Sequence, residues 1–274
     1  MQGFKKKLKN NELLVGTLIT LSSPEITEIM SDVGFDWLWI DMEHAPLDYS
    51  QVQNMIQAAS NTTCIVRSPW NDEVYIKKIL DLGCDGIILP QIKTANEAKL
   101  AIKSCKYPPL GIRSIGIARA QKYGMDFKNY LEKANDDLII MLQIEHIEGI
   151  NNIESITDIK GIDAIIIGPF DLSGSMGLLG QINHPEVENA IKKVKLSCKK
   201  KDIPFGIFTP DSNSAEIHLK QGCKLIAMGI DSNYLWKSAN QALTELDVFT
   251  GMKQALEDKA APLRKFRNNK SKSK

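Results

Sequence analysis

The chain has 274 residues, of which 43% are hydrophobic and 24% are charged. This balance is typical of a folded globular protein and excludes disordered and fibrous chains, and the length suits one large barrel or two small domains. The longest apolar runs are strand-sized, well short of the roughly 20 residues that a membrane-spanning helix needs. Residues 1–11 are basic but lead into no signal-peptide pattern, so we expect a cytoplasmic protein.

The net charge of +1 conceals an asymmetry between the body of the chain and its end. Residues 259–274 contain seven Lys or Arg and no acid, whereas the other residues carry 27 bases against 33 acids. A mildly acidic body argues against a nucleic-acid-binding protein. The basic tail lacks apolar periodicity, so we expect it to be disordered, with binding of a specific anionic partner as the alternative.

The five cysteines are scattered and show no paired spacing. This pattern predicts neither a disulfide framework nor a metal knuckle, and it favours buried small hydrophobic residues in a reducing compartment. A nucleophilic cysteine is the alternative, but none lies in a motif that would lower the pKa of its thiol.

A glycine followed by a short apolar run occurs four times along the chain, at Gly34, Gly83, Gly161 and Gly222. A glycine in the left-handed conformation ends a helix, and a strand that is apolar on both faces can begin at once. Further strands are expected over residues 13–20, 63–67, 138–145 and 204–209, separated by helix-length amphipathic segments. Eight such units over residues 1–258 predict a single (β/α)₈ TIM barrel, with an open doubly wound sheet as the alternative.

One connection breaks this rhythm between the fourth and fifth strands. Residues 107–124 are rich in Gly, Pro and Arg and are longer than an ordinary connection. Long loops of compact domains are often functional, so we expect a lid or a substrate-facing loop over the barrel mouth. A contact between subunits is the alternative.

Polar residues end several of the expected strands. Barrel enzymes carry their reacting groups at the carboxyl ends of strands, so these residues are expected to meet at one rim. They are Asp41, Glu43 and His44 after the second strand, Arg67 after the third, Gln143 and Glu145 at the fifth, and Asp171 after the sixth.

Two of these carboxylates, Glu145 and Asp171, come from adjacent strands. A carboxylate pair with open positions for water and substrate suits Mg²⁺ or Mn²⁺, whereas a zinc site would need more His or Cys. The alternative is a helix-capping or salt-bridge role for each carboxylate. The turn that begins at Gly168 and contains Asp171 is rich in small residues, so its backbone N–H groups can approach a substrate carboxylate, although a plain turn is also possible.

Arg67 and His44 are the candidates for charge stabilisation and proton transfer. Arg67 offers a fixed positive charge that would stabilise an enolate, and a structural salt bridge with Asp41 or Glu43 is the alternative. His44 can exchange a proton near neutral pH, and Asp41 could set its tautomer by a hydrogen bond. The remaining histidines are expected to be structural; these are His146, His184 and His218.

Six motifs in order resemble the HpcH/HpaI-type class II pyruvate aldolases, a family similar to citrate lyase β-subunits. They are DMEHAP at residues 41–46, VRSPWND at 66–72, LDLG at 80–83, YPPLGIR at 107–113, QIE at 143–145 and GPFDLS at 168–173. The similarity in order and spacing runs from about residue 11 to about residue 243. The resemblance implies a (β/α)₈ barrel whose last helix is exchanged between subunits, in dimers that assemble into a hexamer, a trimer of dimers.

The same resemblance implies roles for individual residues. Glu145 and Asp171 would bind the divalent metal, which is Mg²⁺, Mn²⁺ or Co²⁺. Arg67 would support the enolate oxygen, and His44, paired with Asp41, would move protons through water. Asp81 would reach the site of a neighbouring subunit. The substrate-binding residues implied are Arg67, Gln143, Gly168, Pro169, Phe170, Asp171 and Ser173.

The implied activity is reversible aldol cleavage of 4-hydroxy-2-oxo acids to pyruvate and an aldehyde through a pyruvate enolate. Residues 113–124 and 209–213 depart from the best-known aromatic-catabolic members, so the aldehyde stays open. Three alternatives also stay open: lyase or citrate-synthase-like activity on oxaloacetate or acyl-CoA, a Schiff-base aldolase using Lys93, and a non-catalytic metabolite-binding barrel.

Overall fold

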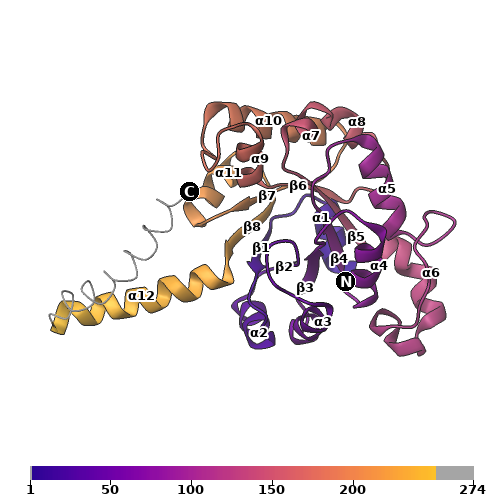
Figure 1. The fold of residues 1–274 in the computed structure, drawn as a ribbon, viewed down its shortest axis with the longest axis horizontal. Helices are drawn as coiled ribbons and strands as arrows, with labels where there is room; N and C mark the ends of the chain where they lie inside the picture. The colour runs from indigo at the N-terminus through magenta and orange to yellow at the C-terminus, as the bar shows by residue number, and fades with distance from the viewer. Residues whose placement is uncertain (1, 251–274) are drawn as a thin grey trace, which may run out of the picture. The chain divides into compact units, whose positions relative to one another are not determined.

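A computed structural model describes residues 2–250 of the chain. Its core is a closed barrel of parallel strands in which each strand pairs with the next and β8 returns to β1 (Figure 1). The strands are β1 (Leu14–Ile19), β2 (Trp37–Asp41), β3 (Thr63–Arg67), β4 (Gly86–Leu89), β5 (Ile139–Ile144), β6 (Ala164–Ile167), β7 (Phe205–Thr209) and β8 (Leu225–Ile230). The predicted (β/α)₈ barrel is confirmed, and the open doubly wound sheet is wrong.

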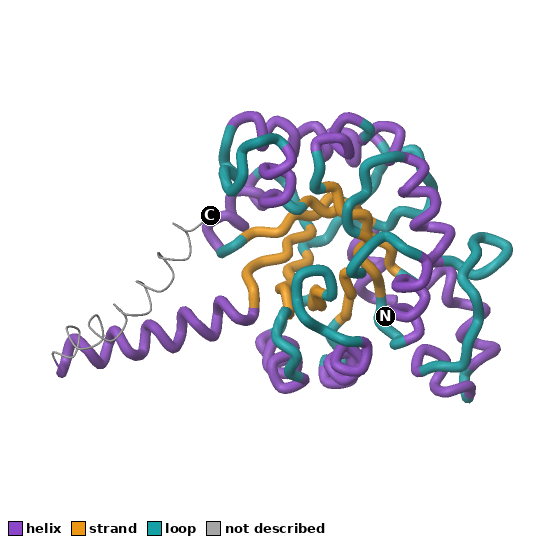
Figure 2. Tube along the Cα trace, viewed as in Figure 1, coloured by secondary structure: helices purple, strands orange, loops and turns teal. Residues whose placement is uncertain are grey.

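Helices surround the strands, which form the orange centre of Figure 2. Helix α1 (Gln2–Lys9) precedes β1, and each strand is followed by at least one helix. These are α2 (Pro24–Val33), α3 (Tyr49–Ala58), α4 (Glu73–Asp81), α5 (Ala95–Cys105), α6 (Phe127–Asp137), α7 (Ile147–Asn151), α8 (Ile153–Thr157), α9 (Pro169–Ser175), α10 (Pro185–Lys200), α11 (Ser212–Lys220) and α12 (Asp231–Thr250), with a 3₁₀ segment η1 (Arg119–Gly124) before α6.

Strand β2 illustrates why the strands are apolar on both faces. Leu38 and Ile40 point outward into the layer that packs on the helices, whereas Trp37 and Trp39 fill the barrel interior. The two indole rings stack with 6.0 Å between centroids. Successive side chains of a strand point to opposite faces, so a strand covered by helices outside and side chains inside has no polar face.

The glycine joints that the sequence indicates are present in the structure. Helix α2 starts after Ser23, whose hydroxyl accepts the Ile26 N–H, and ends at Gly34 with φ of 99°. Gly161 and Gly222 also have positive φ, of 96° and 84°. Residues other than glycine rarely adopt positive φ values. These glycines therefore allow a helix to stop and the next strand to begin within a few residues.

The long connection before β5 lies at the end of the barrel opposite the predicted position. Arg113 forms a 2.7 Å ion pair with Asp81 at the end of α4, and Arg119 donates to the Leu82 carbonyl at 2.8 Å. Helices α4 and α5 both return the chain to the amino ends of the strands, so the segment that follows α5 starts there. The prediction of a lid over the mouth of its own barrel is therefore wrong.

The chain divides into two compact units, residues 1–231 and residues 232–274. The first unit contains the whole barrel, and the second begins within α12. The predicted exchange of this last helix between subunits remains a prediction. The predicted domain end at residue 258 and the basic tail over residues 259–274 lie outside the described residues. Within residues 2–250, every helix is too short or too polar to cross a lipid bilayer.

Candidate active site

Asp41 and Arg67 are the last residues of adjacent strands, and the register of β2 and β3 places them side by side. Both are buried, with 1% and 5% of their surface exposed. Arg67 Nε donates to Asp41 Oδ1 at 2.9 Å, and Nη2 donates to Oδ2 at 2.6 Å. Burial lowers the pKa of Arg67, but the hydrogen bonds to Asp41, together with the negative charges of Asp41, Glu43 and Glu145, outweigh it and raise that pKa. A charged guanidinium is thus held in one orientation at the barrel rim.

Asp41 is the partner of Arg67 and contacts His44 only through the backbone. Its Oδ1 accepts the N–H of Glu43 at 2.9 Å and the N–H of His44 at 3.4 Å, which folds the chain into a turn after β2. The predicted hydrogen bond from Asp41 to the His44 imidazole is replaced by the ion pair with Arg67, because strand register brings the guanidinium directly onto the carboxylate. The imidazole of His44 is 61% exposed at the rim.

Glu43 is a functional candidate to which sequence analysis assigned only a salt bridge. Its Oε2 lies 3.1 Å from Arg67 Nη1 and 4.0 Å from His44 Nε2. The side chain is 10% exposed, and Oε2 is buried without a hydrogen bond. Burial raises the pKa of Glu43 to about 8; Arg67 opposes this shift, while Glu145 and Asp41 add to it. Its place in the same strand-end turn as Asp41 and His44 put it among the residues expected at the rim, but no local pattern indicated that its Oε2 would be buried.

Replacing Glu43 with glutamine is expected to change how thermal stability depends on pH. A carboxyl group whose pKa is raised on folding favours the folded state below its unfolded pKa and loses that contribution as pH rises through about 8. In EDTA-treated protein, wild type and Glu43→Gln should melt alike near pH 4, below the ordinary glutamate pKa of 4.5, and the variant should melt higher at pH 9. Calorimetry across this pH range tests whether the pKa of Glu43 is raised. Glu132→Gln, at an exposed position, is the control. A constant difference in melting temperature between wild type and Glu43→Gln at all pH values would contradict the raised pKa.

Gln143 and Glu145 extend the same network from β5. Gln143 Oε1 lies 3.5 Å from Arg67 Nη1, and its Nε2 donates to Glu145 Oε2. Glu145 Oε1 accepts the backbone N–H of Gln91 at 2.8 Å. Burial raises the pKa of Glu145 to about 7; the Gln91 N–H opposes this, and the charge of Asp171 adds to it. A single chain of contacts therefore joins Arg67, at the end of β3, to a buried carboxylate after β5.

Gly168 leaves the space that this carboxylate occupies. A Cβ atom at residue 168 would lie 2.9 Å from both Gln143 Nε2 and Glu145 Oε2. Real Cβ atoms do not approach neighbours so closely, so any side chain here would displace Gln143 or Glu145. Gly168 therefore allows the backbone of the turn to pack closely on the buried side chains of Gln143 and Glu145.

The turn after β6 carries Asp171 to the rim. Pro169 is the first residue of α9, and Asp171 lies in its first turn with its side chain exposed. Phe170 is 41% exposed, and its ring centroid lies 6.2 Å from that of Phe208. Ser173 is fully buried; its hydroxyl donates to the Phe170 carbonyl at 2.7 Å and accepts the Gly180 N–H at 3.0 Å. Ser173 therefore shapes this turn, and its buried hydroxyl does not fit the predicted contact with substrate.

The rim suits a hard divalent cation. The negative charge of Asp171 reaches Glu145 and adds to the rise in its pKa, and the nearby Glu43 Oε2 lies 3.1 Å from Arg67 Nη1 without accepting a hydrogen bond. Arg67 contacts Asp41 and Glu43 directly and is connected to Glu145 through Gln143. Carboxylate oxygens around an open mouth are the ligands that Mg²⁺ and Mn²⁺ prefer. Among the described residues no set of three or more His, Cys, Asp or Glu is arranged to hold a metal, so water and substrate would complete the coordination of a cation held by two carboxylates.

Asp81 lies far from this rim within its own chain. It is the last residue of α4, at the amino ends of the strands, where it pairs with Arg113. Its side chain is 22% exposed, whereas that of Arg113 is 2% exposed. The two ends of the barrel are separated by the length of the strands, so Asp81 cannot join His44 or Glu145 of the same chain.

The other histidines and the cysteines have structural surroundings in the described part of the chain. His146 and His184 cap α7 and α10, because Nδ1 of each accepts a backbone N–H. His218 is half-buried in α11, away from the rim. The five cysteines are free thiols, and burial raises the pKa of each. A thiolate nucleophile is therefore disfavoured.

Comparison with known proteins identifies relatives over most of the chain. Residues 15–238 match the family model described as HpcH/HpaI aldolase/citrate lyase. A 4-hydroxy-2-oxo-heptane-1,7-dioate aldolase from Escherichia coli is 37% identical over 240 residues, which cover 86% of this chain and 91% of that protein. A hydroxypyruvate/pyruvate aldolase from Sagittula stellata is 36% identical over 239 residues, which cover 86% and 94%.

A solved structure has the same fold. The crystal structure of an HpcH/HpaI aldolase/citrate lyase family protein from Burkholderia cenocepacia superposes with a TM-score of 0.87 at 32% sequence identity. The match covers 90% of this chain and 99% of that protein.

Proposed function

Because the chain belongs to the HpcH/HpaI aldolase/citrate lyase family and is a carbon–carbon lyase of the aldolase type, we propose that it cleaves and forms 4-hydroxy-2-oxo acids with pyruvate as the common product and donor. The observation that carries this proposal is the joining of a buried, charged Arg67 to the carboxylates of the same rim. Enolate chemistry needs both a fixed positive charge and a place for a Lewis acid.

Glu145 and Asp171 are the residues that would hold the divalent cation. The first is buried with one oxygen hydrogen-bonded to Gln91 N–H, and the second lies at the open side of the mouth. A bound Mg²⁺, Mn²⁺ or Co²⁺ would supply Lewis-acid polarisation of the keto oxygen and so acidify the adjacent methyl group. The neutral backbone of the Gly168–Pro169–Phe170 turn faces the same space and would receive the substrate carboxylate.

Arg67 is the residue that we assign to the developing oxyanion. Its Nε and Nη2 are occupied by Asp41, while Nη1 lies between Glu43 at 3.1 Å and Gln143 at 3.5 Å. The guanidinium also lies over the Trp39 ring, with Cζ 5.0 Å from the ring centroid. A donor fixed on three sides needs little reorganisation when negative charge forms beside it.

His44 is the group that we assign to proton movement. Its imidazole is exposed to solvent at the rim, next to Glu43 rather than Asp41. An exposed imidazole can exchange protons with water and can take one from, or return one to, the methyl carbon of pyruvate through a water molecule. Arg67 and His44 thus have separate tasks, the first holding charge and the second moving protons.

The decisive experiment measures deuterium incorporation into the methyl group of pyruvate by NMR, with and without added Mg²⁺ or Mn²⁺. Metal-dependent exchange is expected, and it needs no knowledge of the aldehyde. Parallel assays with pyruvate plus aldehydes and with oxaloacetate plus acetyl-CoA separate aldolase from citrate-synthase-like activity. Borohydride trapping of pyruvate in the presence of EDTA would point instead to a Schiff base. Absence of metal-dependent exchange would contradict the proposal.

Replacing His44 with asparagine is expected to slow methyl exchange by about 10²-fold at neutral pH, the usual effect of removing a proton-transfer group. Binding of Mn²⁺ should be unchanged, because His44 is not one of the proposed ligands. His146→Asn is the matched control, since asparagine also caps helices and His146 caps α7. Exchange by His44→Asn at the wild-type rate would remove His44 from the mechanism.

The remaining parts of the proposal concern assembly and location. We propose a cytoplasmic homo-oligomer in which the last helix is exchanged and Asp81 reaches a neighbouring subunit's rim. The position of Asp81 at the amino ends of the strands supports this, because from there it can contribute only to another chain. Light scattering tests the expected hexamer.

A further inference from the structure

A cavity of about 590 Å³ lies between α10 and α11 and against β7. Neighbouring helices elsewhere pack closely, as α2 does on α3 and α4 on α5, whereas α10 and α11 make no comparable contact among the described residues. The strand between them contributes Phe205 and Thr209 to the cavity wall. The cavity size is in the range of small-molecule sites, and none of Asp41, Glu145 and Asp171 lines it.

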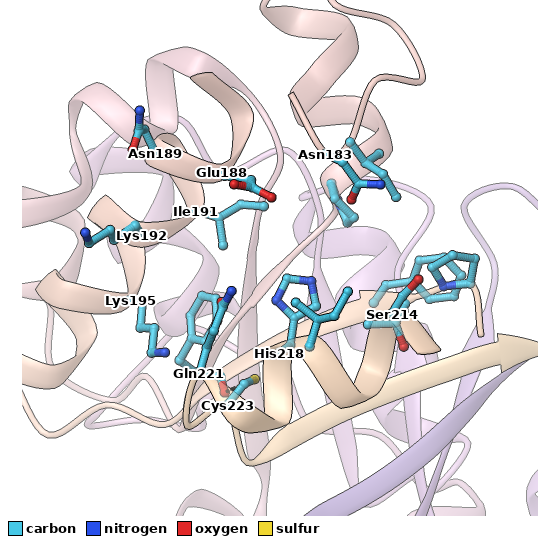
Figure 3. A pocket seen from close by; sticks show the side chains of 17 residues that line it. Asn183, Glu188, Asn189, Ile191, Lys192, Lys195, Ser214, His218, Gln221 and Cys223 are labelled. Atoms are coloured by element: carbon cyan, nitrogen blue, oxygen red, sulfur yellow. Dashed lines mark hydrogen bonds between the residues drawn. The ribbon is translucent and has the colours of Figure 1, made fainter. Parts of the chain in front are cut away.

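Two helix faces supply the lining. Glu188, Ile191 and Lys195 belong to one face of α10, and Ser214, Ile217 and His218 recur at helical spacing on α11. Figure 3 shows the His218 ring and the Glu188 carboxylate directed toward the middle of the cavity from opposite helices. Ile191 is buried there, and Ile217 keeps 54% of its surface exposed. The cavity therefore offers polar groups together with an apolar wall that a ligand body would cover.

The charges around His218 indicate what kind of ligand would fit. His218 and Gln221 both line the cavity, and the pKa of His218 is influenced by the positive charge of Lys195 and the negative charge of Glu188, both from α10. Lys192 also lines the cavity and extends away from His218 in Figure 3. Burial lowers the pKa of His218, as does the positive charge of Lys195, so both favour the uncharged imidazole. The charges of Lys195 and Glu188 offset one another. If His218 takes up a proton, its positive charge can be balanced by one negative charge on a ligand.

We propose that this cavity is a second ligand site, separate from the aldolase rim, for a small monocarboxylate with an apolar body. The carboxylate lies between Lys195, His218 and Gln221, and the apolar body covers Ile191 and Ile217. Pro169 is part of the cavity wall and directly precedes Phe170 and Asp171. The second site thus shares one wall with the turn proposed for the substrate carboxylate.

Histidine NMR with benzoate as the probe tests this site. The full chain, saturated with Mg²⁺ and labelled in its histidine rings, contains four histidines, and the resonance missing from His218→Gln identifies His218. Benzoate in the millimolar range is expected to shift the His218 resonance saturably and to raise its pKa. Binding should tighten as pH falls from 8 to 6 and should lose this pH dependence in His218→Gln.

Two lysine variants make the test specific. Lys195→Gln should weaken benzoate binding about threefold to tenfold, because it removes a charge-assisted hydrogen bond at a half-exposed position. Lys193→Gln changes the same residue type on the same helix but does not line the cavity, and its affinity should equal that of wild type. If only the His44 resonance moves, or if all histidine shifts stay linear in benzoate concentration, the proposed site does not exist. Equal weakening in both lysine variants would also overturn it. This experiment measures benzoate binding at His218 and not turnover. A negative result for the second site can therefore be distinguished from a negative result in the aldolase assay.

Discussion

Replacing Arg67 with lysine is expected to lower the rate of pyruvate methyl exchange, and kcat/KM for aldol cleavage, by about 10²–10⁴-fold. Lysine keeps the positive charge but cannot reproduce the two parallel hydrogen bonds of 2.9 Å and 2.6 Å that fix the guanidinium on Asp41. The charge would then move away from the position where the enolate oxygen forms. Steady-state kinetics and NMR exchange on the same preparation measure both effects.

A structural role of Arg67 can be separated from a catalytic one by thermal unfolding. Asp41 is 1% exposed, and removing the partner of a buried charge costs about 3–5 kcal/mol when the charge is left without compensation. Arg67→Lys keeps a compensating charge, so its loss of stability should be smaller than that of Arg67→Met. If Arg67→Lys melts at a lower temperature yet turns over at nearly the wild-type rate, Arg67 only holds the fold together and its assignment to the oxyanion is wrong.

Replacing Glu145 with glutamine is expected to reduce turnover by about 10³-fold or more, because it removes the buried ligand of the proposed cation and with it the Lewis acid. The substitution preserves the shape of the side chain, which lies between Gln91 N–H and the Gln143 amide. Titration with Mn²⁺, followed by electron paramagnetic resonance, should show an affinity reduced by at least about 10²-fold.

Glu148→Gln is the matched control for this experiment. Glu148 lies three residues further along, in the first turn of α7, and is exposed. Its replacement removes the same charge from the same region without touching the rim, so Mn²⁺ affinity and turnover should be unchanged. Wild-type Mn²⁺ affinity in Glu145→Gln would show that the cation is held elsewhere.

The residues of the candidate site could be selected from the sequence because each ends an apolar run. Asp41 and Arg67 end β2 and β3, and Glu145 follows β5. Parallel strands of a barrel present their carboxyl ends to one rim, so the position of each residue in the chain was enough to bring it there. Once the fold is known to be a parallel barrel, residues that end different strands can be predicted to lie close together.

The contacts within the rim were less accessible to sequence reasoning. Asp41 lies three residues before His44, and this proximity in the chain favoured a hydrogen bond between them. In the structure, the register of β2 against β3 places Arg67 closer, and Glu43 becomes the carboxylate nearest to the imidazole. Register between strands is set by packing of the whole barrel and leaves no local signal.

The sequence by itself determined the alternation of strands and helices, the glycine joints at Gly34 and Gly222, and the residues that end each strand, because these depend on local backbone preference and on burial at a fixed period. Only the tertiary structure decided three other features. They are the pairing of Asp41 with Arg67, the position of residues 107–124 at the amino ends of the strands, and the cavity between α10 and α11. Each depends on distances between segments that are far apart in the chain. Those distances are determined by the volumes of the packed side chains and by the spacing of the helices.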